Sequence, residues 1–279
     1  MINLLLFPLC LAGIACLLSR RVPLGAPLLA CSVVVLASMF STNARPGSVL
    51  PFGAVLAAYL TALQFPKISR KMVSFYIAIL LVGAAYSVIR DGDMKGGELW
   101  RNEYAALVLL AYGLLPTWLL LPALFLTGCR SAVLGVLGAG VLHWRKWWMI
   151  AGLFVVGIAL LFLRPLTVGI RLENWRVAFE LLKLSPWTGY GVGSTYTLFK
   201  LTHLDSLPVT LLLEFGVLGI LPFLWLLWEI ILLITRINSP HKHALTAFLL
   251  MHLAEAPLYF LATAIPFGVI LGLAHDDTR

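Results

Sequence analysis

Long apolar runs separated by short polar breaks form the dominant pattern of this chain. Most of the runs are close to the roughly 20 apolar residues that a helix needs to cross a bilayer. No polar segment is long enough to build a separate soluble core, so we expect a single membrane domain over residues 1–279. The runs cover residues 2–18, 22–40, 49–66, 72–89, 104–127, 131–143, 147–163, 208–235 and 244–274.

Two of these runs need interpretation. The last run contains Glu255, Pro257 and Pro266, and because proline removes a backbone hydrogen bond, it predicts two shorter helices that meet at a break. The run 104–127 fits either one tilted span or a re-entrant hairpin. The pattern as a whole predicts an all-α, polytopic transmembrane helical bundle of about nine or ten helices.

Composition agrees with a membrane protein. Hydrophobic residues make up 61% of the chain and charged residues 11%, whereas soluble domains average about 45–50% and about 25%. The net charge of +8 comes from basic residues scattered in short loops, which is typical of membrane orientation and contact with lipid head groups. We therefore expect membrane lipids, and no nucleic acid, as partners. The four cysteines show no metal-ligand spacing, so no metal site is expected.

The charge of the short loops predicts the orientation. Residues 143–146 and 236–243 are basic, so the positive-inside rule puts both on the cytoplasmic side. The chain between them then crosses outward and returns, which makes residues 164–207 a large loop on the outer face. In the N-terminal half, residues 66–71 and 90–103 both have cytoplasmic character. Simple alternation does not place both inside, so the topology there stays open.

The outer loop is predicted to contain an amphipathic helix that lies in the membrane interface. Apolar residues recur at helical spacing on one side of it, and charged residues fall on another. The apolar positions are Leu172, Trp175, Phe179 and Leu182, and the charged positions are Arg176, Glu180 and Lys183.

Two further features of this loop point toward a ligand. The loop carries several basic residues on the side where the positive-inside rule expects few, and binding of an anionic ligand would explain them. Gly189, Gly191 and Gly193 alternate after the predicted helix. They predict a mobile turn whose backbone N–H groups can approach a ligand closely.

Three ordered motifs resemble a known family. The first reads TGCRSAVL at residues 127–134. The second is GIR at residues 169–171, followed by Trp175 and by GYGVG at residues 189–193. The third is DS at residues 205–206, followed by LLLEFGVLG. In order and spacing they resemble the bacterial O-antigen ligase and O-antigen polymerase superfamily, which are membrane glycosyltransferases. The resemblance covers about residues 100–275.

The resemblance implies an enzyme that transfers a glycan from undecaprenyl pyrophosphate to a sugar hydroxyl, without metal or cofactor, at the periplasmic face of the bacterial inner membrane. Arg130 and Arg171 match family arginines that would bind the departing pyrophosphate, and Arg176 lies one turn beyond. Guanidinium suits this task because it stays charged and binds phosphate bidentately. In the plain alternative, Arg130 snorkels at a span end and the other two are solvated. The implied partners are the undecaprenyl pyrophosphate-linked glycan and, as a further candidate, a chain-length regulator.

The acceptor hydroxyl needs a base. Ligases of the family have a histidine followed by asparagine at this position, where this chain has Asp205 and Ser206. His203 takes the role if the register shifts by two residues, so both Asp205 and His203 are candidates. Asp205 also suits the N-cap of the next span. An aspartate here resembles the polymerase branch, so we expect a repeat-unit polymerase of O-antigen or capsule, with a ligase as the alternative.

The sequence is also compatible with other functions, and further polar residues lie in its apolar runs. A transporter or flippase of an anionic lipid would also use basic residues and broken helices, and the short chain also fits an inactive relative. Glu214 is expected to bond within the site or to brace a neighbouring helix. Glu255 is expected to bond backbone amides freed at the break, and His252 to pack in the core.

Overall fold

The computed structural model describes residues 24–91, 101–114, 124, 127, 129–144, 151, 155, 165–201, 204 and 206–278. Regular secondary structure in these residues is entirely helical, which confirms the all-α prediction. The α-helices are α2 (Gly25–Ser38), α3 (Leu50–Gln64), α4 (Pro66–Asp91), α5 (Arg101–Leu114), α7 (Arg130–Trp144), α9 (Pro165–Leu184), α10 (Ser194–Phe199), α11 (Leu207–Arg236), α12 (Pro240–Met251) and α13 (Leu261–Asp276). Two 3-10 turns are η1 (Pro46–Val49) and η2 (Pro257–Tyr259).

The helices follow the apolar runs closely. The last run divides as predicted into α12 and α13, and we call the connection between them, residues 252–260, the break segment. The amphipathic pattern of the outer loop forms a helix, α9, which is longer than the pattern. The first apolar run and almost all of the run 147–163 lie outside the described residues, as does most of the second half of the run 104–127.

Two described helices are long and apolar enough to cross a bilayer. They are Pro46–Gln64, which joins η1 to α3, and α11. Gly25–Ser38, Arg130–His143 and Leu261–Asp276 are apolar but shorter. Large apolar side chains of α11 are exposed, as suits a helix that faces lipid; they include Leu221, Leu224, Trp225 and Trp228. These helices support an association with membranes.

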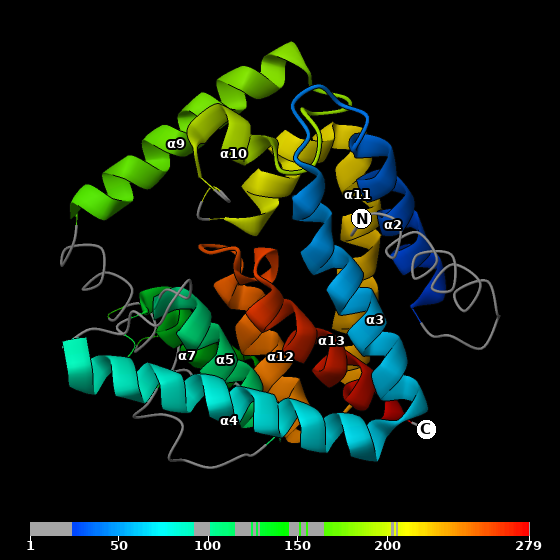
Figure 1. The fold of residues 1–279 in the computed structure, drawn as a ribbon, viewed down its shortest axis with the longest axis vertical. Coiled ribbons are helices and arrows are strands. Elements are labelled where there is room, and N and C mark those ends of the chain that lie inside the picture. The colour runs from blue at the N-terminus through cyan, green and yellow to red at the C-terminus, as the bar shows by residue number, and fades with distance from the viewer. Residues whose placement is uncertain are drawn as a thin grey trace.

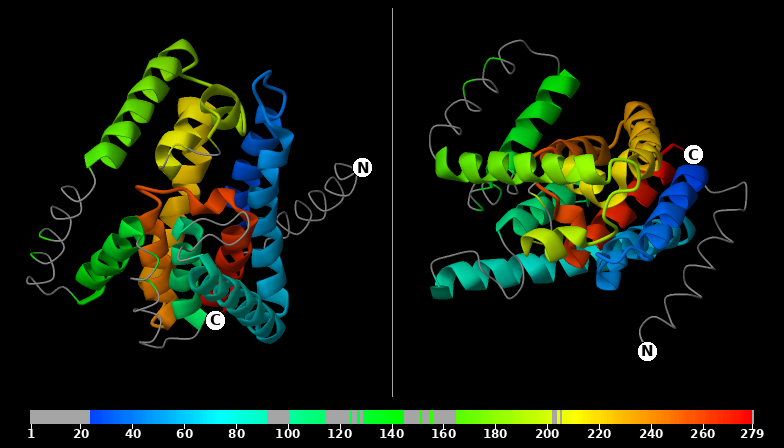
Figure 2. Two further views of the ribbon diagram at one scale, coloured as in Figure 1. Left: turned by 60° about the vertical axis from the view of Figure 1, so that its left-hand side comes forward. Right: turned by 90° about the horizontal axis from the view of Figure 1, so that it is seen from above.

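The helices form two halves on either side of the break segment (Figures 1 and 2). In Figure 1, α9, α10 and the first part of α11 lie above the break segment, and α5, α7 and α12 lie below it. Helix α4 crosses the lower end of the molecule at a steep angle to α3. The helices of a simple up-and-down bundle would instead lie nearly parallel to one another. The turn from α11 to α12 is at the lower end, so the predicted cytoplasmic side is the lower one.

Small residues let the helices of the lower half approach closely. A Cβ added at Gly268 of α13 would overlap the Val55 carbonyl oxygen of α3, and one added at Gly272 would lie 2.8 Å from the Tyr59 carbonyl oxygen. At the crossing of α7 and α12, a Cβ at Gly135 would lie 2.5 Å from the Ala247 carbonyl oxygen. Close backbone approach at small residues is a common way for helices to pack in membranes.

Helix α11 is two helical segments rather than one straight span. Gly216 has φ +66° and ψ −174°, and these backbone angles lie outside the helical region. The rings of Phe215 and Phe223 stack with centroids 5.1 Å apart, although eight residues of straight helix would separate them by about 12 Å. The segment after the bend has about 20 residues, and it still spans about 30 Å.

Candidate functional site

Arg171 lies on the face of α9 that packs against the rest of the molecule. It shares this face with Trp175 and Ala178, four and seven residues further on. Its Nη2 donates to the Glu255 carboxylate at 2.5 Å, and its Nη1 donates to the Ala254 carbonyl oxygen at 2.9 Å. Its side chain is 25% exposed, and that of Glu255 is 3% exposed. The arginine that the family resemblance selected is therefore held at the break segment.

The break segment also receives the start of α11. The Leu207 backbone N–H donates to the carbonyl oxygens of His252, at 3.0 Å, and Glu255, at 3.3 Å. Helix α11 begins at Leu207, and Ser206 occupies its N-cap position without a side-chain bond. The N-terminus of α11 and Arg171 thus share one anchor, Glu255, which contributes its carbonyl to one and its carboxylate to the other.

The N-terminus of α7 belongs to the same region. Arg130 is the first residue of α7 and its side chain is half-buried. A Cβ added at Gly135, five residues further along α7, would lie 3.5 Å from the Met251 backbone nitrogen at the end of α12, so the N-terminus of α7 lies near the start of the break segment. Two helix N-termini and the Arg171 guanidinium therefore converge at the break segment, and each contributes positive charge.

Arg176 is not brought to this place. Five residues of helix turn it about 140° away from Arg171 around the α9 axis. Its guanidinium donates two bonds, of 2.7 and 2.9 Å, to Glu173 in an exposed pair on the solvent side. This hydrogen bond holds the pKa of the Glu173 carboxyl below its usual value. Among the three arginines of the sequence prediction, Arg176 has the surroundings of an ordinary surface charge.

The two candidate bases, Asp205 and His203, lie outside the described residues, but their neighbours are fixed. Leu204 is buried, and its carbonyl oxygen accepts a 2.8 Å bond from the Trp175 indole N–H. Its N–H donates to the Thr210 hydroxyl at 3.0 Å. Ser206 occupies the N-cap position of α11, one residue after the Asp205 that the alternative prediction placed there.

Glu214 joins α11, α10 and η2 through hydrogen bonds, in agreement with the expectation that it braces a neighbouring helix. Its side chain is fully buried in the first segment of α11. It accepts hydrogen bonds from the Thr195 hydroxyl at 3.1 Å and from the Tyr259 hydroxyl at 2.7 Å. The carboxyl group therefore ties α11 to α10 and to the turn η2 at the end of the break segment.

The backbone N–H groups of residues 189–191 are hydrogen-bonded within the protein, so the prediction that they approach a ligand is wrong. The backbone N–H groups of Tyr190 and Gly191 donate to the carbonyl oxygens of Leu213 and Glu214, at 3.0 and 2.7 Å. Beyond the bend, the Val217 N–H donates to the Pro186 carbonyl oxygen at 2.8 Å. Residues 186–191, which we call the glycine turn, thus take up backbone groups that the bend at Gly216 removes from the helix.

The ion-pair partner of Arg171 is the site residue that the sequence did not identify. Glu255 was expected to bond backbone amides, but its carboxylate binds Arg171, 84 residues away in the chain. A signal was present, because a lone carboxylate in an apolar segment usually pairs with a cation. The choice among the basic residues of the outer loop needed the fold.

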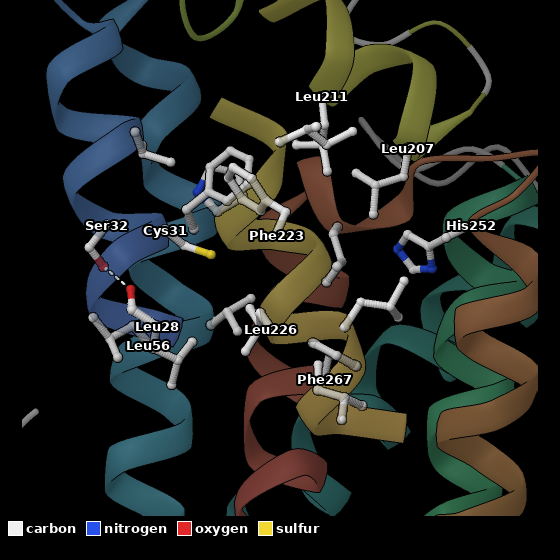
Figure 3. Close-up of a pocket in the computed structure, with 18 of the residues that line it drawn as sticks. Leu28, Cys31, Ser32, Leu56, Leu207, Leu211, Phe223, Leu226, His252 and Phe267 are labelled. Carbon is white, nitrogen blue, oxygen red and sulfur yellow. Dashed lines mark hydrogen bonds between the residues drawn. The ribbon is translucent and has the colours of Figure 1, made fainter. Parts of the chain in front are cut away.

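An apolar cavity of about 220 Å³ lies beside the break segment, which contributes His252, Leu253 and Leu258 to its wall. Figure 3 shows it between α2 and α3 on one side and α11 and His252 on the other. His252 is buried, and its Nδ1–H donates a 2.6 Å hydrogen bond to the Phe248 carbonyl oxygen, as expected for a packing residue. The cavity wall is suited to hydrocarbon rather than to polar groups. It is lined by, among others, Leu28, Val35, Leu56, Leu211 and Phe223.

Metal ligands do not cluster in the described part of the chain, where no three His, Cys, Asp or Glu side chains lie together. No known protein-family model matches the chain, and comparison with curated proteins finds no relative.

Proposed function

We propose that the protein is a membrane glycosyltransferase. It transfers a glycan from undecaprenyl pyrophosphate to a sugar hydroxyl at the outer face of the bacterial inner membrane, as a repeat-unit polymerase of O-antigen or capsule. The observation that carries the proposal is the convergence at the break segment of Arg171, the α7 N-terminus that begins with Arg130, and the α11 N-terminus that follows Asp205. These are the three motifs of the sequence resemblance, and they are far apart in the chain.

The chemistry of the reaction matches these groups. The bond between the sugar and the pyrophosphate oxygen breaks, and negative charge develops on the leaving pyrophosphate. Fixed cations and helix N-termini stabilise that charge without a metal. The acceptor hydroxyl gives its proton to Asp205 or His203 and forms the new glycosidic bond. The apolar cavity beside the break segment is compatible with a lipid-linked substrate.

A deletion strain tests this proposal through the banding pattern of its surface polysaccharide. Loss of a polymerase leaves single repeat units, whereas loss of a ligase leaves long chains on the lipid carrier. Uptake of a labelled substrate by proteoliposomes, without new glycosidic bonds, would instead favour the transporter.

Complementation with single variants then tests the site. Arg171→Ala should lower the amount of product about 100- to 1,000-fold, as removal of one group that stabilises the transition state does. Lys183→Ala is the matched control, because Lys183 is an exposed cation on the same helix, paired with Glu180. Both variants must reach wild-type levels in the membrane. Wild-type banding with Arg171→Ala would contradict the assignment.

A further inference from the structure

The partner of Arg171 is an unusual feature of the site. A solvated arginine at a membrane surface needs no carboxylate, yet Glu255 is almost completely buried and touches the guanidinium at 2.5 Å. A second donor of the same guanidinium is held by the Ala254 carbonyl oxygen. Two contacts from adjacent residues fix both the position and the plane of the group.

Stability is a poor reason for such a pair. Removing a carboxylate and a guanidinium from water is unfavourable, and their attraction often does no more than offset this cost. The contact does limit the freedom of a long, flexible side chain. A guanidinium that is held in one orientation loses less entropy when it binds a phosphate group, and misplacement by about 1 Å can cost a reaction on the order of 100-fold in rate.

Glu255 is itself held firmly. Its N–H donates to the Met251 carbonyl oxygen at 3.0 Å, and its own carbonyl oxygen accepts from Leu207. Four residues later, Tyr259 bonds the buried Glu214. The carboxylate therefore stands on backbone that is tied at both ends, to α11 on one side and to α12 on the other.

We propose that Glu255 is the positioning residue of the transferase site. It holds the Arg171 guanidinium beside the N-terminus of α11, in the orientation that receives the pyrophosphate leaving group. This inference rests on the proposed function. Glu255 acts through Arg171 and does not touch the substrate. Its charge offsets part of the charge on Arg171 in the ground state and in the transition state alike, so the benefit of Glu255 comes from the orientation of the guanidinium.

A double-mutant cycle tests the inference with purified protein in detergent and a lipid-linked oligosaccharide as donor. Glu255→Gln should lower kcat on the order of 100-fold, with a KM for the donor that is unchanged or lower. In the Arg171→Ala background, Glu255→Gln should change kcat by no more than about twofold, since the residue through which it acts is gone. A merely structural glutamate would lower the yield of folded protein and leave kcat per folded molecule unchanged.

Glu255→Asp keeps the charge and retracts the carboxylate by one methylene, so it serves if Glu255→Gln does not accumulate. It should also lower kcat while the protein remains folded. Glu180→Gln is the control, because it removes an exposed carboxylate that pairs with Lys183 on α9, and it should behave as wild type.

Two results would overturn the inference. One is a kcat of Glu255→Gln, or of Glu255→Asp if only that variant folds, within about twofold of wild type; the other is losses that multiply in the double variant. A wild-type protein that shows no transfer in the strain assay contradicts the proposed function, and the inference with it. An active wild type with an unaffected Glu255 variant contradicts the inference alone.

Discussion

Two contacts in this molecule depend on glycine for different physical reasons. Between α3 and α13, Gly268 and Gly272 have helical backbone, and the missing side chain lets two regular helices approach. Between α11 and the glycine turn, Gly189 and Gly216 have φ values of +64° and +66°. There the glycine is needed for its backbone conformation as well as for space.

The first contact belongs to the helical framework, whereas the second supports the candidate site. No backbone hydrogen bond joins α3 to α13 among the described residues. The two helices can therefore shift slightly without losing a backbone hydrogen bond. In the contact of α11 with the glycine turn, the two segments exchange backbone hydrogen bonds across the bend. These hydrogen bonds restrict that contact to one geometry. Glu214 belongs to this contact, and its hydrogen bond from Tyr259 connects the contact to the end of the break segment.

The largest effect is expected from Gly216→Ala. Its φ and ψ lie in a region that is essentially restricted to glycine, and an added Cβ would lie 2.5 Å from the Trp187 carbonyl carbon and the Gly189 nitrogen. Strain and overlap together should cost about 3 kcal/mol or more. Size-exclusion profiles and thermal midpoints in detergent should show little folded protein. A variant as stable as wild type would mean that the bend is not required.

A smaller loss is expected from Gly268→Ala. The helix can keep its backbone conformation, but the new methyl group meets the Val55 carbonyl oxygen, so α13 must move away from α3. Overpacking of this kind costs about 2 kcal/mol. The thermal midpoint should fall, while the activity per folded molecule remains. If Gly268→Ala proved more disruptive than Gly216→Ala, the distinction between the two contacts would fail.

Tyr259→Phe should cost still less. It removes the 2.7 Å bond to Glu214 and keeps the ring, which packs edge-to-face against Phe52 with centroids 5.6 Å apart. Loss of one hydrogen bond should lower the stability by about 1 kcal/mol, because Thr195 still donates to the carboxyl. Chemical denaturation in detergent measures this value. Thr195→Val is the companion variant, and no change in either would exclude Glu214 as a brace.

The sequence predicted the helical framework well because periodicity and breaks are local signals. The polar break after α2 and the prolines after Glu255 mark real helix ends, and the amphipathic pattern marks α9. The bend at Gly216 was not predictable in this way. The stretch around it is a continuous apolar run, and the groups that stabilise the bend belong to the glycine turn, about 25 residues earlier.

The sequence predicted residues of the candidate site, but it did not predict which residues they contact. The motif selected Arg171, and the chemistry of a leaving pyrophosphate explained why an arginine should be there. The motif favoured Arg171 over Arg176, although both fall in one short helix, but it named no partner for either residue. The packing face of α9 determines the partners, since it directs Arg171 to Glu255 and leaves Arg176 with Glu173 in solvent.

The smallest effect is expected at a glycine with neither of these tasks. Gly169 lies in α9, two residues before Arg171, and a Cβ added there meets no atom within 4 Å. Its backbone is helical, so Gly169→Ala should stabilise the protein by about 0.5–1 kcal/mol through helix propensity. Its transfer activity should match that of the wild type. A thermal midpoint and a rate measured on one preparation test both expectations. A stable variant with a reduced rate would mean that the substrate approaches the α9 backbone at Gly169, and it would give the GIR motif a direct part in binding beside that of Arg171.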